Sequence, residues 1–153
     1  PRLLRPGGIT LEQLESVLGR VEVDQAVTRL MSAGEKPRAP GMKYRHYAPK
    51  APVTVVAGPP ERTAEHIARS LTPGDGVICF DEFAGEFPGC QIQRMGPAGD
   101  KSAQARHIFD ALRAFDHTEV PRIWAQCPDP SGLGLAINNR LNKAAGFHIV
   151  EVK

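Results

Sequence analysis

The spacing of hydrophobic residues changes several times along the chain and predicts alternating strands and helices after residue 52. Short apolar runs are typical of buried strands, whereas apolar residues that recur every three or four positions indicate helices with one buried face. The predicted strands are 53–57, 77–80, 92–95, 123–126 and 148–152, and the predicted helices are 63–71, 100–115 and 135–145. Strands that alternate with helices predict an α/β fold with a Rossmann-like, mostly parallel sheet flanked by helices.

A separate helix is predicted near the start of the chain. Thr10 is a suitable N-cap, Gln13 completes a capping box, and Gly19 ends the helical pattern. A second helix is predicted over residues 24–33, where apolar residues again recur at helical spacing. This short helical part therefore precedes the predicted α/β domain.

An extended linker is predicted between the two parts, over residues 36–52. This segment holds four prolines, one glycine, five Lys or Arg residues and no acidic residue. Proline removes a backbone donor and keeps the preceding residue extended. The composition therefore predicts an extended, basic connection.

The middle of the linker carries side chains suited to a nucleotide. Lys43 and Arg45 can neutralise phosphate charge, His46 can donate to phosphate oxygens, and Tyr44 and Tyr47 can cover a base or donate hydrogen bonds. A strip of this kind could close over a nucleotide and exclude water. The same residues also suit single-stranded nucleic acid, or a basic linker whose tyrosines only pack against the domain.

The overall composition limits the classes of function. The 153 residues fit one domain with an appendage, and 41% of them are hydrophobic, as in a globular protein. No apolar run approaches the roughly 20 residues of a membrane helix. The three cysteines are widely spaced and contain no CxxC pair, which argues against a disulfide framework and a zinc site. We therefore expect a cytoplasmic setting without membrane partners.

Three further polar groups occur at positions where binding sites are often found. The turn 129–134 follows a strand and opens a helix, a context that can hold an anion, but its glycines match neither a P-loop nor GxGxxG, and a plain turn is favoured. Asp81 and Glu82 end a strand without a metal-binding pattern, so no metal site is predicted. Asn139 and Arg140 form a polar helix face directed at another domain or at solvent.

The ten residues 40–49, Pro-Gly-Met-Lys-Tyr-Arg-His-Tyr-Ala-Pro, resemble the interdomain linker of two-domain threonylcarbamoyl-AMP synthases, the long form of the YrdC-like family. Residues 4–10 are similar to the segment that closes the catalytic domain of this family, and residues 134–145 to the end of its accessory domain. Ala39 stands where the family often has Ser.

The resemblance implies a division of the chain into three parts. Residues 1–20 would be a remnant of the YrdC-like catalytic domain, residues 21–52 the interdomain linker with its lid motif, and residues 53–153 the Rossmann-like accessory domain. The first residue is not Met, and we expect the missing catalytic domain to lie upstream.

The resemblance also implies a reaction. ATP, L-threonine and bicarbonate would give threonylcarbamoyl-AMP and pyrophosphate, the first step in forming threonylcarbamoyladenosine in transfer RNA. ATP and Mg²⁺ would belong to the full-length enzyme, and no catalytic residue is expected in this chain, which should be inactive alone. Nucleotide contacts are implied for Arg5 and for Tyr44 or Tyr47, with Lys43, Arg45 and His46 as phosphate contacts of the lid.

The predicted role is that of an accessory or regulatory part whose linker gates the active site of the N-terminal domain. Two alternatives stay open. The α/β domain could bind nucleotide, pyrophosphate or transfer RNA, or it could only stabilise or dimerise the catalytic half. We expect no direct contact with transfer RNA, and a homodimer is left open.

Overall fold

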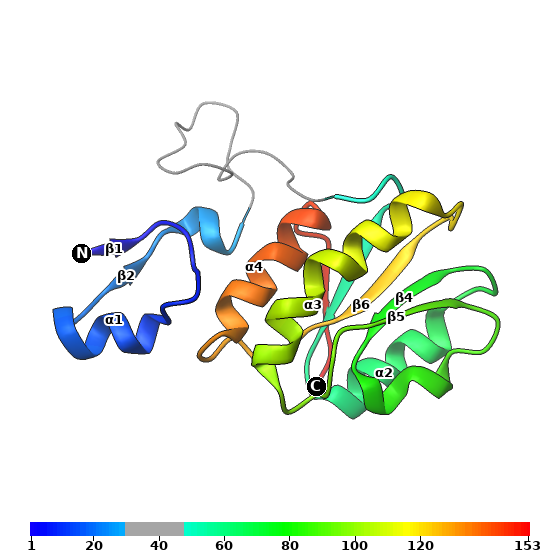
Figure 1. The fold of residues 1–153 in the computed structure, drawn as a ribbon, viewed down its shortest axis with the longest axis horizontal. Helices are drawn as coiled ribbons and strands as arrows, with labels where there is room; N and C mark the ends of the chain where they lie inside the picture. The colour runs from blue at the N-terminus through cyan, green and yellow to red at the C-terminus, as the bar shows by residue number, and fades with distance from the viewer. Residues whose placement is uncertain (30–47) are drawn as a thin grey trace.

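The structure is a computed structural model that describes residues 1–29 and 48–153 (Figure 1). The predicted lid residues 43–47 and residues 30–33 of the predicted helix 24–33 lie outside the described residues. The described residues form an α/β domain and a smaller N-terminal segment.

The α/β domain is built on a five-stranded sheet in which every neighbouring pair of strands is parallel. The strand order is β5-β4-β6-β3-β7. The strands are β3 (Val53–Ala57), β4 (Gly76–Cys79), β5 (Gln91–Arg94), β6 (Ile123–Gln126) and β7 (Ile149–Glu151). The sequence prediction gave β3 and β6 with these bounds and placed the other three within two residues of them. The predicted α/β fold is confirmed.

Helices cover both faces of the sheet. The α-helices are α2 (Pro60–Ser70), α3 (Lys101–Ala114) and α4 (Gly134–Ala144), and short 3₁₀ helices follow β4 and α3 at η2 (Asp81–Glu86) and η3 (Phe115–His117). The connection through α2 runs along the sheet in the opposite direction to those through α3 and α4. Because parallel crossovers are right-handed, α2 lies on one face and α3 and α4 lie together on the other. Figure 1 shows α3 beside α4 in front of the sheet.

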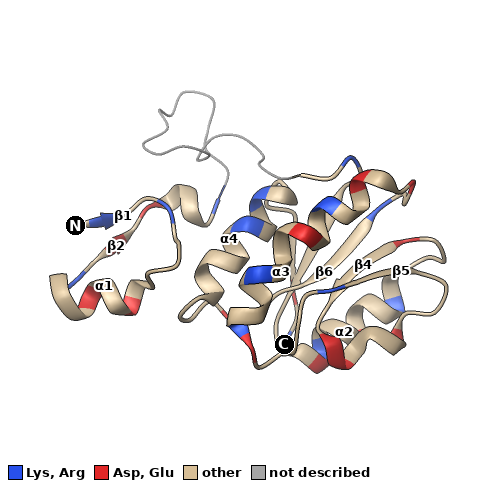
Figure 2. Ribbon diagram, in the orientation of Figure 1, with Lys and Arg blue, Asp and Glu red and all other residues tan. Residues whose placement is uncertain are grey.

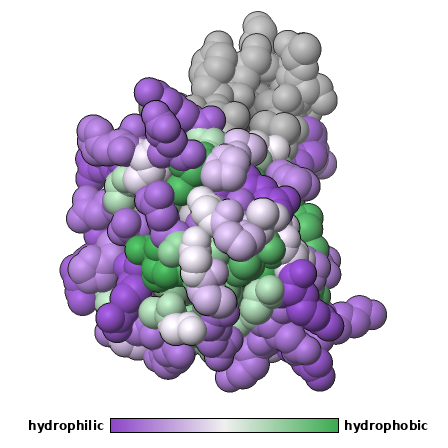
Figure 3. Space-filling view, turned by 90° about the vertical axis from the view of Figure 1, so that its right-hand side faces the viewer, coloured by the Kyte–Doolittle hydropathy of each residue, from purple (hydrophilic) through white to green (hydrophobic). Residues whose placement is uncertain are grey.

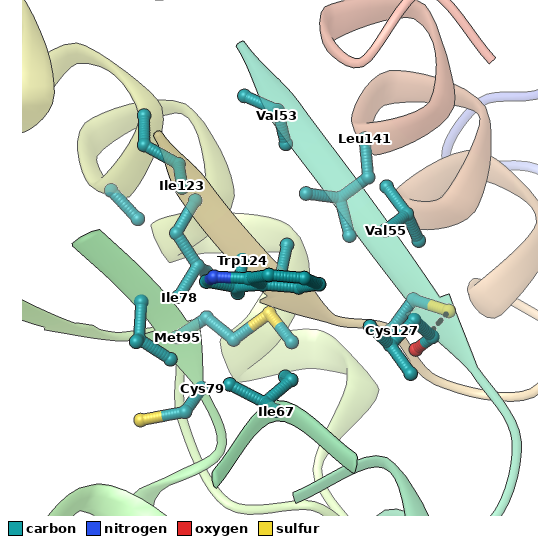
Figure 4. Close-up of a cluster of buried hydrophobic side chains, with 14 of the residues drawn as sticks. Val53, Val55, Ile67, Ile78, Cys79, Met95, Ile123, Trp124, Cys127 and Leu141 are labelled. Atoms are coloured by element: carbon teal, nitrogen blue, oxygen red, sulfur yellow. Dashed lines mark hydrogen bonds between the residues drawn. The ribbon is translucent and has the colours of Figure 1, made fainter. Parts of the chain in front are cut away.

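Side chains from all of these elements meet in one core (Figure 4). Ile67 of α2, Ile78 of β4 and Leu141 of α4 are fully buried. Cys79 and Cys127 are buried as well, and burial raises the pKa of each thiol to about 12. Both thiols stay protonated at neutral pH, which is the behaviour of small hydrophobic residues expected from the sequence.

The N-terminal segment is a small unit of its own. Strand β1 (Arg2–Leu3) pairs in parallel with β2 (Glu22–Val23), and α1 (Leu11–Leu18) connects them. The predicted capping box is present, with Thr10 and Gln13 bonded reciprocally at 2.8 and 3.1 Å. The β1–β2 pairing joins residues on both sides of the boundary that was predicted at residue 20.

The predicted helix 24–33 is wrong over the described residues. Only the 3₁₀ helix η1 (Gln25–Val27) forms, with Asp24 as its N-cap. Ala26 and Val27 are buried, and the Val27 carbonyl accepts a hydrogen bond from the side chain of Asn139 at 3.0 Å. This tertiary contact occupies a carbonyl that a continuing helix would use for its own ladder.

The large hydrophobic side chains that are exposed among the described residues lie in the N-terminal segment, at Ile9, Val17, Leu18 and Val23. Figure 3 looks onto the end of the α/β domain that lies at the right of Figure 1, where hydrophobic side chains gather in the centre of a hydrophilic surround. Among the described residues, no helix has the length and apolar character needed to span a membrane.

Candidate functional site

The N-terminal segment contacts the α/β domain along α4, and we call this contact the seam. At one end, the Gly132 amide donates to the Glu12 carboxylate at 3.0 Å. At the other end, the Asn139 side chain donates to the Val27 carbonyl at 3.0 Å. The seam therefore holds two separate parts of the N-terminal segment, at Glu12 and at Val27, against one helix and the turn that precedes it.

A small cavity lies in the middle of the seam. It has a volume of about 120 Å³ and lies between Gly7 and Gly8 on one side and α3 and α4 on the other. The Arg140 guanidinium lies over the Phe109 ring at 5.3 Å and donates to the Ala136 carbonyl at 3.1 Å. Pockets that enclose a drug-sized ligand have volumes of roughly 300 Å³ or more. This cavity is too small to enclose a nucleotide by itself.

Arg140 lines this cavity, and Lys143, one turn further along α4, lies within electrostatic reach of Arg5 and Arg140. Arg5, which the resemblance implied as a nucleotide contact, is exposed, whereas Lys143 of α4 is buried with 8% of its surface accessible. Burial lowers the pKa of Lys143, and the nearby charges of Arg5 and Arg140 lower it further. Figure 2 shows Lys and Arg positions on α4. The structure brings Arg5 to α4, and its nucleotide contact stays a prediction.

The turn before α4 is held in shape by a lysine from the neighbouring helix. The Lys101 ammonium bonds the Asp129 carboxylate at 3.0 Å, the Ser131 carbonyl at 2.7 Å and the Ser131 hydroxyl at 2.9 Å. Hydrogen bonds from Ser131 and Lys101 lower the pKa of Asp129 to about 2. Gly134 is required here because a side chain at this position would collide with the Asp129 carbonyl.

This turn is the segment for which the sequence left anion binding open. The anion that it binds in the structure is the Glu12 carboxylate of the same chain, at the start of α4. The hydrogen bond from Gly132 is the largest cause that lowers the pKa of Glu12. A carboxylate at a helix N-terminus is the favourable sign of charge for the helix dipole.

A buried glutamine fills the carboxyl edge of the sheet, where doubly wound folds usually bind their ligands. The Gln126 side chain accepts from the Phe80 amide at 2.9 Å and donates to the Pro60 carbonyl and the Thr63 hydroxyl at 3.0 Å each. It is fully buried. Gly58 closes the same edge, because a side chain there would collide with the Val152 carbonyl. Protein groups therefore occupy the usual ligand crevice.

Sequence reasoning missed the role of Gln126. Its only signal was a polar residue at the end of the apolar run 123–126, and its partners lie 46 to 66 residues away. The partner of Glu12 is 120 residues away and was missed for the same reason.

The other polar candidates have ordinary roles. Asp81 pairs with Arg94 at 3.2 Å, and Glu82 accepts from the Ala98 amide at 2.9 Å. Within residues 1–29 and 48–153, no three His, Cys, Asp or Glu side chains are grouped as a metal site would need. Asn139 faces the N-terminal segment of this chain rather than solvent.

The chain is similar to known proteins along nearly its whole length. Residues 9–146 match the family described as "Threonylcarbamoyl-AMP synthase, C-terminal domain". The threonylcarbamoyl-AMP synthase of Bacillus subtilis is 42% identical over 153 residues, and that of Pyrococcus abyssi is 40% identical over 156 residues. These alignments cover 98% and 99% of this chain but 43% and 44% of the relatives, so the chain spans less than half of their length.

Solved structures agree with this similarity. A doubly substituted P. abyssi Sua5 protein superimposes with a TM-score of 0.86 at 38% identity, over 99% of this chain and 43% of that one. P. abyssi Sua5 in complex with L-threonine gives a TM-score of 0.78 at 36% identity, over 100% of this chain and 44% of that one. A C-terminal Sua5 domain from Pyrococcus horikoshii gives 0.54 at 30% identity, over 69% of this chain and the whole of that one.

Proposed function

The chain belongs to the family of threonylcarbamoyl-AMP synthase C-terminal domains, and from this premise we propose that it is the accessory part of an enzyme that makes threonylcarbamoyl-AMP. The substrates of the full-length enzyme would be ATP, L-threonine and bicarbonate, with pyrophosphate as the second product. The product would serve threonylcarbamoyladenosine formation in transfer RNA, in the cytoplasm.

The observation that carries the proposal is the unequal coverage of the alignments. Nearly all of this chain aligns with the two curated relatives, yet more than half of each relative has no counterpart here. The matching family is described as a C-terminal domain, which leaves the remaining length to an N-terminal part. We assign the chemistry to that part.

The described residues support this division of labour. The carboxyl edge of the sheet is occupied by Gln126, and Asp129 and Lys101 bond each other. We therefore place ATP and Mg²⁺ on the N-terminal part, with Arg5 and the residues after it at the border.

The linker would act as a lid over that active site. Lys43, Tyr44, Arg45, His46 and Tyr47 combine phosphate-binding and base-covering side chains in one strip without acids. Closing such a strip over an adenylate would exclude water, which hydrolyses mixed anhydrides.

The lid is tested in the full-length protein with Tyr44→Ala combined with Arg45→Ala. We expect the rate of threonylcarbamoyl-AMP formation to fall at least tenfold, which corresponds to about 1.4 kcal/mol of activation free energy. ATP consumption should continue if the adenylate is released and hydrolysed. Adenylate and pyrophosphate are measured together by chromatography. Lys50→Ala, in the linker but outside the lid residues, is the matched control. Equal product formation and retention in both variants would exclude the lid.

A stabilising domain without a role in gating is the second candidate, and the seam favours it because the Asn139 side chain of α4 holds the carbonyl of the buried Val27 at 3.0 Å. Deleting residues after Pro52 distinguishes the two functions. A stabilising role predicts a lower melting temperature with an unchanged rate per folded molecule. A binding module would instead show tight binding of ATP, pyrophosphate or transfer RNA to this chain alone in calorimetry.

A further inference from the structure

The seam contains a polar cluster that joins the N-terminal segment to the α/β domain, and we call it the Glu12 latch. Its members are Glu12, Lys101, Asp129, Ser131 and Gly132. We propose that the turn 129–132 and Lys101 form the docking point of the α/β domain for the catalytic part of the protein, with the Glu12 carboxylate as the group that they hold. This inference rests on the proposed function, because it takes the catalytic part as the occupant.

The receiving side of the latch is held by hydrogen bonds that do not involve Glu12. Lys101 makes three bonds to Asp129 and Ser131, and the Ser131 amide donates to Asp129 at 3.0 Å. These bonds use the polar groups around Gly132 and leave its amide for Glu12, a contact between residues 120 positions apart. The turn therefore presents one donor to a carboxylate, beside a lysine and a helix N-terminus.

The arriving side is equally fixed. Glu12 lies in the first turn of α1, between Thr10 and Gln13, and the reciprocal hydrogen bonds of this capping box fix the backbone of that turn. Glu12 is also the residue of α1 for which a side-chain bond to the α/β domain is found in the described structure. The orientation of α1 therefore determines where the Glu12 carboxylate meets the turn.

The opposite end of α1 indicates the occupant. Val17 is 82% exposed and Leu18 is 55% exposed, and α1 buries none of its residues in the described structure. An amphipathic helix is stable in water mainly when its apolar face is packed. The aligned relatives have more than half of their length outside this alignment. We infer that the exposed apolar end of α1 packs against that catalytic part. Helix α1 would then contact the α/β domain through its N-terminal end and the catalytic part through its C-terminal end.

The charges agree with this arrangement. Acidic positions lie on α1 and Lys and Arg positions lie on α4, whereas α3 carries charges of both signs (Figure 2). The latch itself is a carboxylate beside a lysine at the N-termini of α3 and α4.

The test uses the full-length protein, with the catalytic part present, and compares Glu12→Ala with Glu15→Ala. Glu15 lies one turn later on the same helix and is exposed, which makes it a matched control. In Glu12→Ala we expect the Gly132 amide to exchange its hydrogen at least tenfold faster, while the Ser131 amide, bonded to Asp129, is unchanged. Glu15→Ala should leave both amides unchanged.

Docking is measured separately by the distance between one spin label on the catalytic part and one at Asp116. We expect this distance distribution to broaden in Glu12→Ala and in Lys101→Met, and to broaden less in Glu12→Gln, which keeps an acceptor oxygen. A distribution in Glu12→Ala that matches Glu15→Ala overturns the proposal, whatever happens at Gly132. A wild-type full-length protein that makes no threonylcarbamoyl-AMP would refute the proposed function and leave the distance result standing.

Discussion

Replacing Asp75 with Ala is expected to lower the free energy of unfolding by about 3–4 kcal/mol. Its carboxylate is buried and accepts from the Arg122 guanidinium at 2.8 Å, the Thr72 amide at 2.9 Å and the Trp124 indole at 3.1 Å. Ala leaves the indole and amide donors without their acceptor inside the protein. The melting temperature should fall by roughly 10 °C, which calorimetry measures directly.

Two comparisons separate the buried carboxylate from an ordinary ion pair. Asp110 pairs with Arg113 at 2.9 Å, but both side chains are more than half exposed, and Asp110→Ala should cost less than about 0.5 kcal/mol. Asp75→Asn keeps one acceptor oxygen and should lose less stability than Asp75→Ala. Equal losses in Asp75→Ala and Asp110→Ala would contradict the importance of burial.

The same carboxylate predicts how stability depends on pH. Burial alone would raise the pKa of Asp75, but the hydrogen bonds from Thr72, Trp124 and Arg122 outweigh it and hold the pKa below its ordinary value of 3.8. A lowered folded-state pKa contributes stability that is complete above the ordinary pKa and is lost as pH falls through the folded-state value. The free energy of unfolding, measured with urea, should therefore fall more steeply below pH 3.8 for the wild type than for Asp75→Asn.

Gln126→Met is expected to cost about 2–3 kcal/mol, although the two side chains have similar volumes. The Phe80 amide is buried and would lose its acceptor, whereas the Thr63 hydroxyl keeps its bond to the Pro60 carbonyl at 2.9 Å. The loss is measured from the urea midpoint at constant slope. The Phe80 amide should also exchange its hydrogen faster.

Gln91→Met is the control for this substitution, since Gln91 begins the edge strand β5 and is exposed. We expect a change within about 0.5 kcal/mol. A Gln126→Met protein as stable as Gln91→Met would mean that the hydrogen bonds at the carboxyl edge contribute nothing beyond packing.

Local patterns predicted the elements that depend on local spacing. Strands β3 and β6 and the capping box of α1 follow from runs of apolar residues and from caps within four positions, and the structure has them as expected. The helix predicted over 24–33 failed where a contact from Asn139 competed with the local pattern. Strands β1 and β2 have two residues each, which is too short to show a repeating pattern of hydrophobic and polar residues.

The candidate site was less accessible to sequence reasoning because its contacts are distant in the chain. Glu12 and Gly132 are individually ordinary residues of a helix and a turn, and only the fold brings them within 3.0 Å. Arg5 was implied by resemblance, and its neighbours on α4 became visible only in the structure. The lid residues 43–47 stay a prediction from chemical character and resemblance.

The strand order has a consequence for synthesis on the ribosome. β3 and β4 are not neighbours, because β6 lies between them and pairs with both. Until residue 126 has left the exit tunnel, the emerging chain holds two strands that lack their common partner, and β7 joins β3 only after that. The central sheet can therefore be completed only after β6 and β7 have emerged. Nascent chains stalled before β6 should expose unpaired strand edges and depend on chaperones more than chains stalled after β7.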